Sequence, residues 1–200
     1  AGAVSATETF VSIDRARRTA AGVYVAAEAA PRSRLTLNGG IRIDRVTTRN
    51  RGGYFGDRAT SHGAASGVAA ASVGPFGGVT ITGQVARGFR DPVLSDRYYR
   101  GPTGRGFITG EPDLDPERSL QLDLALRYTR RGLRLALHGY RYRIDDLVER
   151  YETAPDFFFY RNRGGARISG VEAEAQLMPA EGLTIELSAS VARGTALDRL

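Results

Sequence analysis

The sequence predicts an all-β protein: an antiparallel up-and-down meander of about eight long strands that is part of a transmembrane β-barrel. Three observations support this prediction. Apolar residues recur at every second position, the connections between strands are sorted by length, and the second face of the strands is heavily charged. We expect the whole chain, residues 1–200, to form one partial barrel domain.

Alternation of apolar and polar residues identifies the strands. In segment 119–128, Leu120, Leu122 and Leu124 share one face, whereas Gln121 and Asp123 lie on the other. The same period of two runs through segments 35–44, 79–86, 169–177 and 182–192, and more weakly through 22–31 and 64–74. These segments are about as long as the ~9 to 11 residues that a membrane strand needs.

The eighth segment, 133–144, breaks the alternation. Its apolar phase begins at Leu133 and then moves to Tyr140 and Tyr142. We interpret this change as a β-bulge near His138 and Gly139, or as a crossing from an apolar band into an aromatic girdle. Either interpretation keeps the segment as a strand.

The connections predict the architecture. Short and longer breaks alternate along the chain, at Pro31 and at residues 47–63, 74–78, 91–117, 129–132, 152–156 and 179–182. In an antiparallel meander, this alternation places the tight turns at one end of the sheet and the large loops at the other. Transmembrane barrels of outer membranes show this asymmetry, with short periplasmic turns and longer extracellular loops.

Composition excludes several kinds of chemistry. The chain has no Cys and only two His, so disulfides, thiolate catalysis and Cys-ligated metals are excluded. The net charge is +6, with 28 basic residues against 22 acidic ones. Charged side chains on the polar strand faces need partners in a dry core, whereas they are solvated in a wet lumen. We predict no enzyme activity, no catalytic residue, no cofactor and no metal site.

The break at 91–117 is the longest, and loops of this length are usually functional. We expect a short helical turn there, capped by Asp91 with Pro92 at its first position. The candidate ligand-binding residues are basic and aromatic side chains that we expect to face an anionic or aromatic small-molecule ligand above the pore: Arg90, Arg97, Tyr98, Tyr99, Arg100 and Arg105. The alternative is that these residues order the loop and contact lipopolysaccharide phosphates.

Other features have plainer interpretations. Glu172 and Glu174 share one strand face and are interpreted as part of a lumen-facing row of charges rather than as a hydrolytic pair. Aromatic segment 157–160 is interpreted as part of an aromatic girdle. Guanidinium groups suit bidentate phosphate pairing, so lipopolysaccharide is the expected partner of the arginines near loop ends, Arg141, Arg143, Arg150, Arg161 and Arg163.

One stretch resembles a known family. Residues 89–128 contain an aromatic-Arg-x-Pro sequence, a Gly-rich loop and the sequence Gly-Glu-Pro-Asp-Leu-Asp-Pro-Glu at 110–117, followed by a strand. Further on, Asn162, Gly170 and Glu172 match an Asn-x-x-x-x-x-x-x-Gly-x-Glu spacing. Together these elements resemble the late barrel of TonB-dependent outer-membrane receptors. The chain departs from the family at Glu111, where Asn is usual.

The resemblance implies a Gram-negative outer-membrane protein that imports a scarce ligand, such as siderophore-bound iron, haem, cobalamin or a carbohydrate. Receptors of this family have ~22 strands around a separate plug domain. We therefore expect an interior barrel fragment without the plug, with outer-membrane lipid and lipopolysaccharide around it. The energy-coupling TonB complex is expected to act through the absent plug, and no nucleic-acid partner is expected.

Two alternatives remain open from the residues alone. Eight strands are enough for a small closed outer-membrane barrel with a structural or adhesive role. A soluble nucleic-acid-binding β-protein is the third hypothesis, and it rests on the positive charge and scattered aromatic residues.

Overall fold

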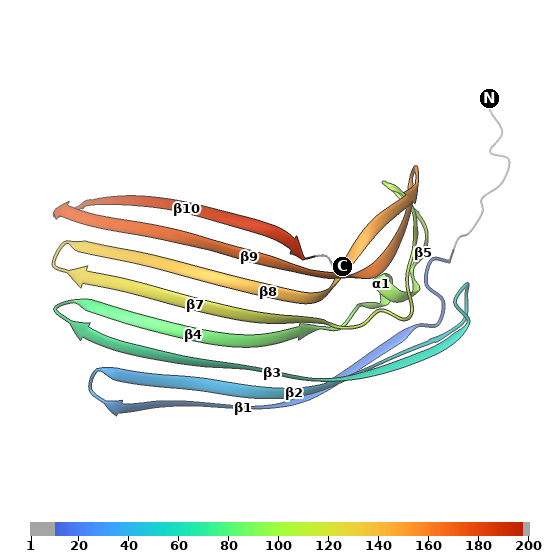
Figure 1. The fold of residues 1–200 in the computed structure, drawn as a ribbon, viewed down its shortest axis with the longest axis horizontal. Helices are drawn as coiled ribbons and strands as arrows, with labels where there is room; N and C mark the ends of the chain where they lie inside the picture. Colours follow the sequence, from blue (N-terminus) through green and yellow to red (C-terminus); the bar gives the residue numbers. More distant parts are fainter. Residues whose placement is uncertain (1–10, 198–200) are drawn as a thin grey trace.

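A single antiparallel meander dominates the fold. The computed structural model describes residues 11–197, which form one sheet in the order β1-β2-β3-β4-β7-β8-β9-β6-β5, with β10 paired to β9 (Figure 1). The long strands are β1 Arg17–Arg32, β2 Leu35–Arg51, β3 Asp57–Phe76, β4 Val79–Arg90, β7 Glu117–Arg130, β8 Leu133–Ala154, β9 Phe157–Ala180 and β10 Leu183–Leu197. The predicted all-β meander of about eight long strands is confirmed.

The connections are sorted by length only in part. Tight turns at 33–34, 77–78, 131–132 and 181–182 gather at one end, and the long connection 91–116 lies at the other (Figure 1). At that same end residues 52–56 join β2 to β3, and residues 155–156 alone join β8 to β9, so the break predicted at 152–156 is a short turn. Two of the tight turns contain Gly132 and Gly182, whose φ angles are 73° and 78°. Glycine adopts this left-handed region without a Cβ clash, so these residues allow the chain to reverse within two positions.

The predicted break at 47–63 is mostly strand, which corrects the sequence interpretation. Strand β2 continues to Arg51 and β3 begins at Asp57, so that only residues 52–56 connect them. Register is unbroken from Leu35↔Val73 to Arg51↔Asp57. Period-two patterning was invisible here because both faces of this extension carry polar residues. Strands β8 and β9 likewise extend beyond their apolar parts, to Ala154 and from Phe157.

The bulge predicted near His138 and Gly139 is absent from the described strand pairing. Strand β8 pairs continuously with β7 from Leu133↔Arg130 to Asp145↔Arg118. Tyr140 and Tyr142 therefore share the polar face with His138, and they are not part of an outward-facing girdle. Their rings stack with centroids 5.0 Å apart, and the Tyr142 hydroxyl accepts a hydrogen bond from Gln121. A tyrosine can satisfy its polar tip on this face, which explains the misleading pattern.

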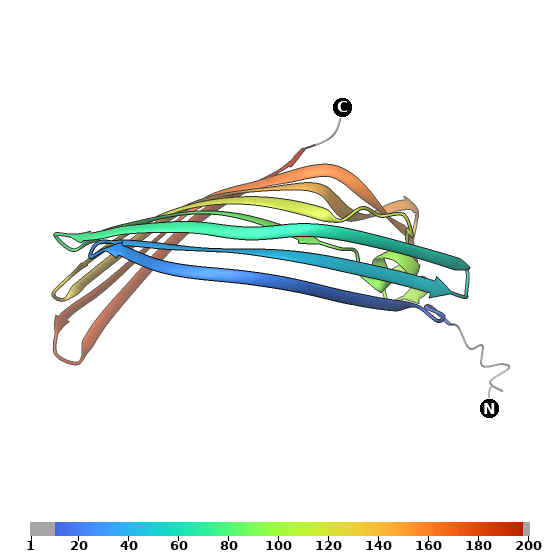
Figure 2. The ribbon, with the colours of Figure 1, turned by 90° about the horizontal axis from the view of Figure 1, so that it is seen from below.

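The sheet is curved, and its two faces differ in chemistry. Figure 2 shows α1 (Leu94–Tyr98) on the concave side of the arch. We call this side the inner face and the convex side the outer face. Leu120, Leu122, Leu124 and Leu126 of β7 lie on the outer face and are 41–60% exposed. Asp123 lies on the inner face and contacts Gln84 and His138.

The buried apolar side chains lie only at the loop end. Among residues 11–197, the buried hydrophobic residues are Val46, Tyr98, Ile108 and Leu114. The long apolar rows of the outer face have no covering layer. A soluble protein rarely leaves so large an apolar surface in water, whereas a barrel wall places it in lipid.

Two further observations concern membrane spans and closure. None of the helical residues in the described chain forms a helix long and apolar enough to cross a membrane. Within residues 11–197, β1 pairs only with β2, and β10 pairs only with β9. The sheet is therefore open at both edges in this structure, unlike the closed eight-stranded barrel considered as an alternative.

Candidate functional site

Residues 91–116 form an ordered structure across the loop end of the sheet. After α1, a hairpin of β5 (Arg100–Thr103) and β6 (Gly106–Thr109) joins β9 in parallel, with Phe107 opposite Phe157 and Thr109 opposite Phe159. The Arg100 amide also donates to the Ser12 carbonyl, in the segment that precedes β1, at 2.9 Å. The loop therefore joins β9 to the segment that leads into β1.

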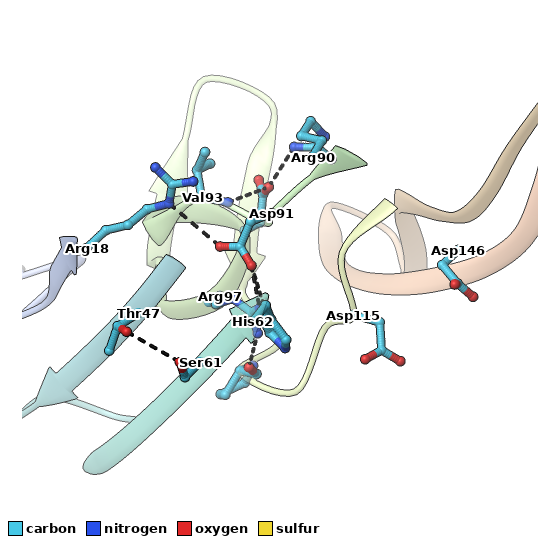
Figure 3. Close-up of polar contacts among 12 residues, drawn as sticks. Arg18, Thr47, Ser61, His62, Arg90, Asp91, Val93, Arg97, Asp115 and Asp146 are labelled. Carbon is cyan, nitrogen blue, oxygen red and sulfur yellow. Dashed lines mark hydrogen bonds and ion pairs between the residues drawn. The ribbon is translucent and has the colours of Figure 1, made fainter. Parts of the chain in front are cut away.

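A buried polar cluster fixes the start of this loop. The Asp91 side chain is fully buried, and its Oδ1 lies 2.8 Å from Nδ1 of His62 on β3 and 3.7 Å from Nη2 of Arg97 on α1 (Figure 3). Arg18 on β1 approaches the second oxygen, at 3.6 Å. Arg97 is also fully buried, and its Nη1 donates to the Pro112 carbonyl at 2.5 Å. We call these four side chains the Asp91 cluster.

Asp91 does not cap the helix, which corrects the sequence interpretation. Helix α1 begins at Leu94 with Val93 at the N-cap position. The capping oxygen comes from Asp96, whose side chain accepts from the Val93 amide at 3.1 Å. Asp91 instead lies at the base of the loop, where it contacts Arg18 of β1, His62 of β3 and Arg97 of α1.

The sequence at 110–117 has a structural explanation. A Cβ at Gly110 would lie 2.6 Å from the backbone of Arg97, so only glycine permits this close approach. Leu114 is 2% exposed and forms part of the buried core beneath the loop. Glu117 accepts from Arg90 and, at 2.8 Å, from the Val148 amide. The motif thus closes the loop onto α1, β4 and β8.

Asn162 of β9 joins the loop to a second irregular point. Its Nδ2 donates to the carbonyls of Asp115 and Asp146, at 3.0 and 2.7 Å. Its Oδ1 accepts from the Asp115 amide at 2.7 Å. Asp146 adopts a φ of 57°, which turns its carbonyl out of the regular ladder. One side chain therefore satisfies three backbone groups of two segments.

Asn162→Ala should loosen the end of the loop. The substitution removes three hydrogen bonds. The bond to the Asp146 carbonyl is partly buried, and leaving such a group unpaired costs ~1 to 3 kcal/mol, whereas the exposed groups of Asp115 can bond to water. Faster amide hydrogen exchange at Asp115 and its neighbours is the expected result. The matched control is Asn38→Ala, because Asn38 is exposed on β2 and makes no side-chain hydrogen bond among the described residues. Equal exchange rates in the two variants would contradict the role given to Asn162.

The six candidate ligand-binding residues occupy different environments. Arg97 is 0% and Tyr98 1% exposed, and burial raises the pKa of Tyr98. Arg90 pairs with Glu117 and Asp96. Tyr99 donates to the Pro102 carbonyl, and Arg100 stacks over the rings of Tyr54 and Phe107. Arg105 is exposed at the hairpin tip, and no carboxylate of residues 11–197 pairs with it. Ligand contact by all six stays a prediction.

A small hollow lies beside Arg100. It has a volume of about 150 Å³, and Asp14, Asn50, Tyr54 and Tyr98 contribute to its lining. The Asn50 side chain is held by the carbonyls of Gly52 and Gly56, both at 2.7 Å. Cationic, aromatic and acidic groups thus meet at one place on the loop end.

The outermost hairpin of β8 and β9 carries its own ion-pair group. Arg161 and Arg163 both donate to Glu149, which lies above the apolar band. Although its burial alone would raise the pKa of Glu149, the hydrogen bonds from the two arginines outweigh this effect and hold the pKa below its ordinary value. Segment 157–160 belongs to the same hairpin. It lies at the opposite end of β9 from Leu177, and this separation exceeds the ~9 to 11 residues that cross the apolar band. The segment is therefore too far from the band to form its aromatic girdle.

The inner face below the loop is polar and hollowed. Nε2 of His138 lies 3.1 Å from Asp123, and its Nδ1 lies 3.8 Å from Glu172. Glu172 and Glu174 face this side together, as the predicted row of lumen charges requires, and they line a hollow of about 290 Å³. Within the described part of the chain, no group of three His, Asp or Glu side chains is placed to hold a metal ion.

Sequence reasoning missed the partners of Asp91. Asp91 itself was noticed as a helix cap, but His62 and Arg18 come from other strands and carry no local motif. Asn162 was noticed only through its spacing from Gly170 and Glu172. Its contacts with Asp115 and Asp146 depend on long-range pairing that no sequence pattern displays.

Comparisons with known proteins agree on one architecture. The family model described as "TonB dependent receptor-like, beta-barrel" matches residues 2–196. The copper transporter OprC is 20% identical, with a TM-score of 0.77 over 91% of this chain and 31% of that chain. The Serratia marcescens hemophore receptor HasR, solved with its hemophore HasA and heme, is 16% identical, with a TM-score of 0.77 over 88% and 34%. The FrpB iron transporter of Neisseria meningitidis is 18% identical, with a TM-score of 0.70 over 92% and 27%. The chain thus spans about a third of the length of these solved chains.

Proposed function

Because the chain belongs to the β-barrel family of TonB-dependent receptors, we propose that it forms part of the barrel wall and of the extracellular opening of an outer-membrane receptor for a scarce ligand. Members of this family are transporters and not enzymes, so the role of the chain is one of transport. Uptake through the proposed receptor is energised by the TonB complex in a Gram-negative envelope.

The arrangement of the loop carries this proposal. Residues 91–116 bridge the inner face at the loop end, while the outer face beneath them is apolar and the inner wall is polar. A ligand that enters from the loop side therefore meets an ordered surface before it meets the lumen. The first candidates are metal-bearing ligands: ferric siderophore, haem or copper. The similar folds of the copper transporter OprC, the hemophore receptor HasR solved with heme, and the iron transporter FrpB support these candidates.

Uptake measurements test the proposal. Cells that lack the gene are compared with complemented cells for accumulation of copper, of haem iron and of iron from a panel of siderophores. Accumulation of one of these ligands should require the gene, and it should stop when TonB is deleted although surface binding persists. Accumulation that is identical with and without the gene, for every ligand including cobalamin and carbohydrates, would contradict the proposal.

Arg105→Ala tests the ligand-binding loop. Arg105 is the unpaired cation at the hairpin tip, and loss of a charge-assisted hydrogen bond to an anionic ligand should weaken binding about tenfold. The measurement is equilibrium binding of the transported ligand to whole cells. Arg131→Ala is the control, since Arg131 lies in a tight turn at the opposite end of the sheet. An equal loss in both variants, or none in Arg105→Ala, would argue against ligand capture by this hairpin.

A further inference from the structure

Four arginines gather on the outer face of β8, β9 and β10. Arg143 lies opposite Arg167, and Ser169 lies between Arg141 on one side and Arg193 on the other. Neighbouring strands are ~4.8 Å apart and alternate residues on one strand ~6.6 Å apart. The four side chains therefore emerge from two adjacent levels of three adjacent strands. We call them the outer arginine cluster.

Few anionic partners neutralise this cluster. Arg143 pairs with Asp145 at 3.0 Å. Within residues 11–197, Arg141, Arg167 and Arg193 have no carboxylate within 4.0 Å, and the buried Nε of Arg167 has no hydrogen-bond partner. The other arginines near these strand ends differ. Arg161 and Arg163 are engaged by Glu149, and Arg150 lies over the Phe158 ring.

The cluster lies at the edge of the apolar band. On the tight-turn side of Arg141, β8 presents Leu137, Leu135 and Leu133 on the same face, and β10 presents Val191, Leu187 and Ile185 on the same side of Arg193. The cluster is thus placed where acyl chains end and headgroups begin, at the extracellular boundary. Arginine side chains reach toward such a boundary while their stems remain on apolar surface.

We propose that the outer arginine cluster binds the phosphate groups of a phosphorylated lipid in the outer leaflet, with the acyl chains lying on the apolar rows below. Guanidinium groups pair bidentately with phosphate, and several cations at one depth recognise an anionic headgroup. The inference rests on the outer-membrane location in the proposed function. It does not depend on which ligand is transported.

Lipid retention tests the site. The full protein is purified in mild detergent, incubated with lipid A, and analysed by native mass spectrometry as wild type and as Arg141→Gln/Arg193→Gln. Wild type should retain lipid A but not its dephosphorylated form, and the double variant should bind lipid A at least about tenfold more weakly. Arg141→Lys/Arg193→Lys should restore part of the binding and shows that the positions tolerate substitution.

The control is Arg130→Gln, because Arg130 is an exposed outer-face arginine of β7 at the opposite end of the apolar band. It should retain lipid A as wild type does. Equal weakening by Arg130→Gln, equal retention of dephosphorylated lipid A, or full displacement of lipid A by equimolar inorganic phosphate would overturn the proposal. Uptake of the transported ligand, measured in the same variants, separates failure of the lipid site from failure of the transport function.

Discussion

Arg97→Ala should release the loop at 91–116 from the sheet. The substitution leaves the Asp91 carboxylate buried with a weaker set of partners and leaves the Pro112 carbonyl without its donor. Breaking a buried pair by removing one partner typically costs ~3 to 5 kcal/mol. The expected result is rapid proteolysis within the loop and loss of amide protection from Asp91 to Pro112, while the long strands stay protected. Hydrogen exchange followed by mass spectrometry measures both regions in one experiment.

Two further variants make this prediction specific. Arg105→Ala removes an exposed arginine from the same loop and should change protection by less than about 0.5 kcal/mol. Combining Arg97→Ala with Asp91→Asn should cost less than the sum of the two single changes, because the uncompensated charge is removed together with its partner. Equal rates of amide hydrogen exchange in Arg97→Ala and Arg105→Ala would show that the Asp91 cluster does not hold the loop.

Leu124→Arg should obstruct insertion of the wall. Leu124 is on the outer face in the middle of the leucine row of β7 and is 60% exposed in the isolated sheet. An arginine at this depth of a barrel wall faces hydrocarbon and costs ~2 to 4 kcal/mol. Lower yield of folded protein in the outer membrane is the expected outcome, and folding into phospholipid vesicles at graded denaturant concentrations measures the free energy.

The adjacent residue provides the matched control. Ala125 faces inward and lines the hollow that also contains Glu172 and Glu174. An arginine there has carboxylates nearby and an aqueous surrounding, so Ala125→Arg should cost less than about 1 kcal/mol. If both substitutions reduced folding equally, the assignment of lipid to the outer face and water to the inner face would be wrong.

Alternation predicted the wall because each strand has two chemically distinct environments. The five clearest segments all became long strands, and the leucine row at 120–126 lies on one face as expected. Alternation failed where the environments are alike. Residues 47–51 and 57–63 have polar side chains on both faces, so their pairing follows from the register of the apolar residues below. Tyr140 and Tyr142 led to the wrong prediction of a bulge or an outward-facing girdle for a related reason. A tyrosine ring is amphipathic and is therefore stable on a polar face as well.

The site was predicted in outline only. The sequence located the long loop and the motif at 110–117, but it did not show that Arg97 and Tyr98 are buried. Burial of an arginine depends on acceptors supplied by distant residues, here Asp91 and Pro112. The outer arginine cluster was likewise visible only in part. Arg141 and Arg143 were noticed near a strand end, whereas Arg167 and Arg193 join them through strand pairing.

The parallel pairing of β6 with β9 limits the movement of the loop at 91–116. The hairpin of β5 and β6 pairs with β9 at three consecutive positions. It cannot move as a hinged flap without breaking these pairings. This side of the loop end is therefore expected to keep one shape, and any opening of the inner face must come from other segments.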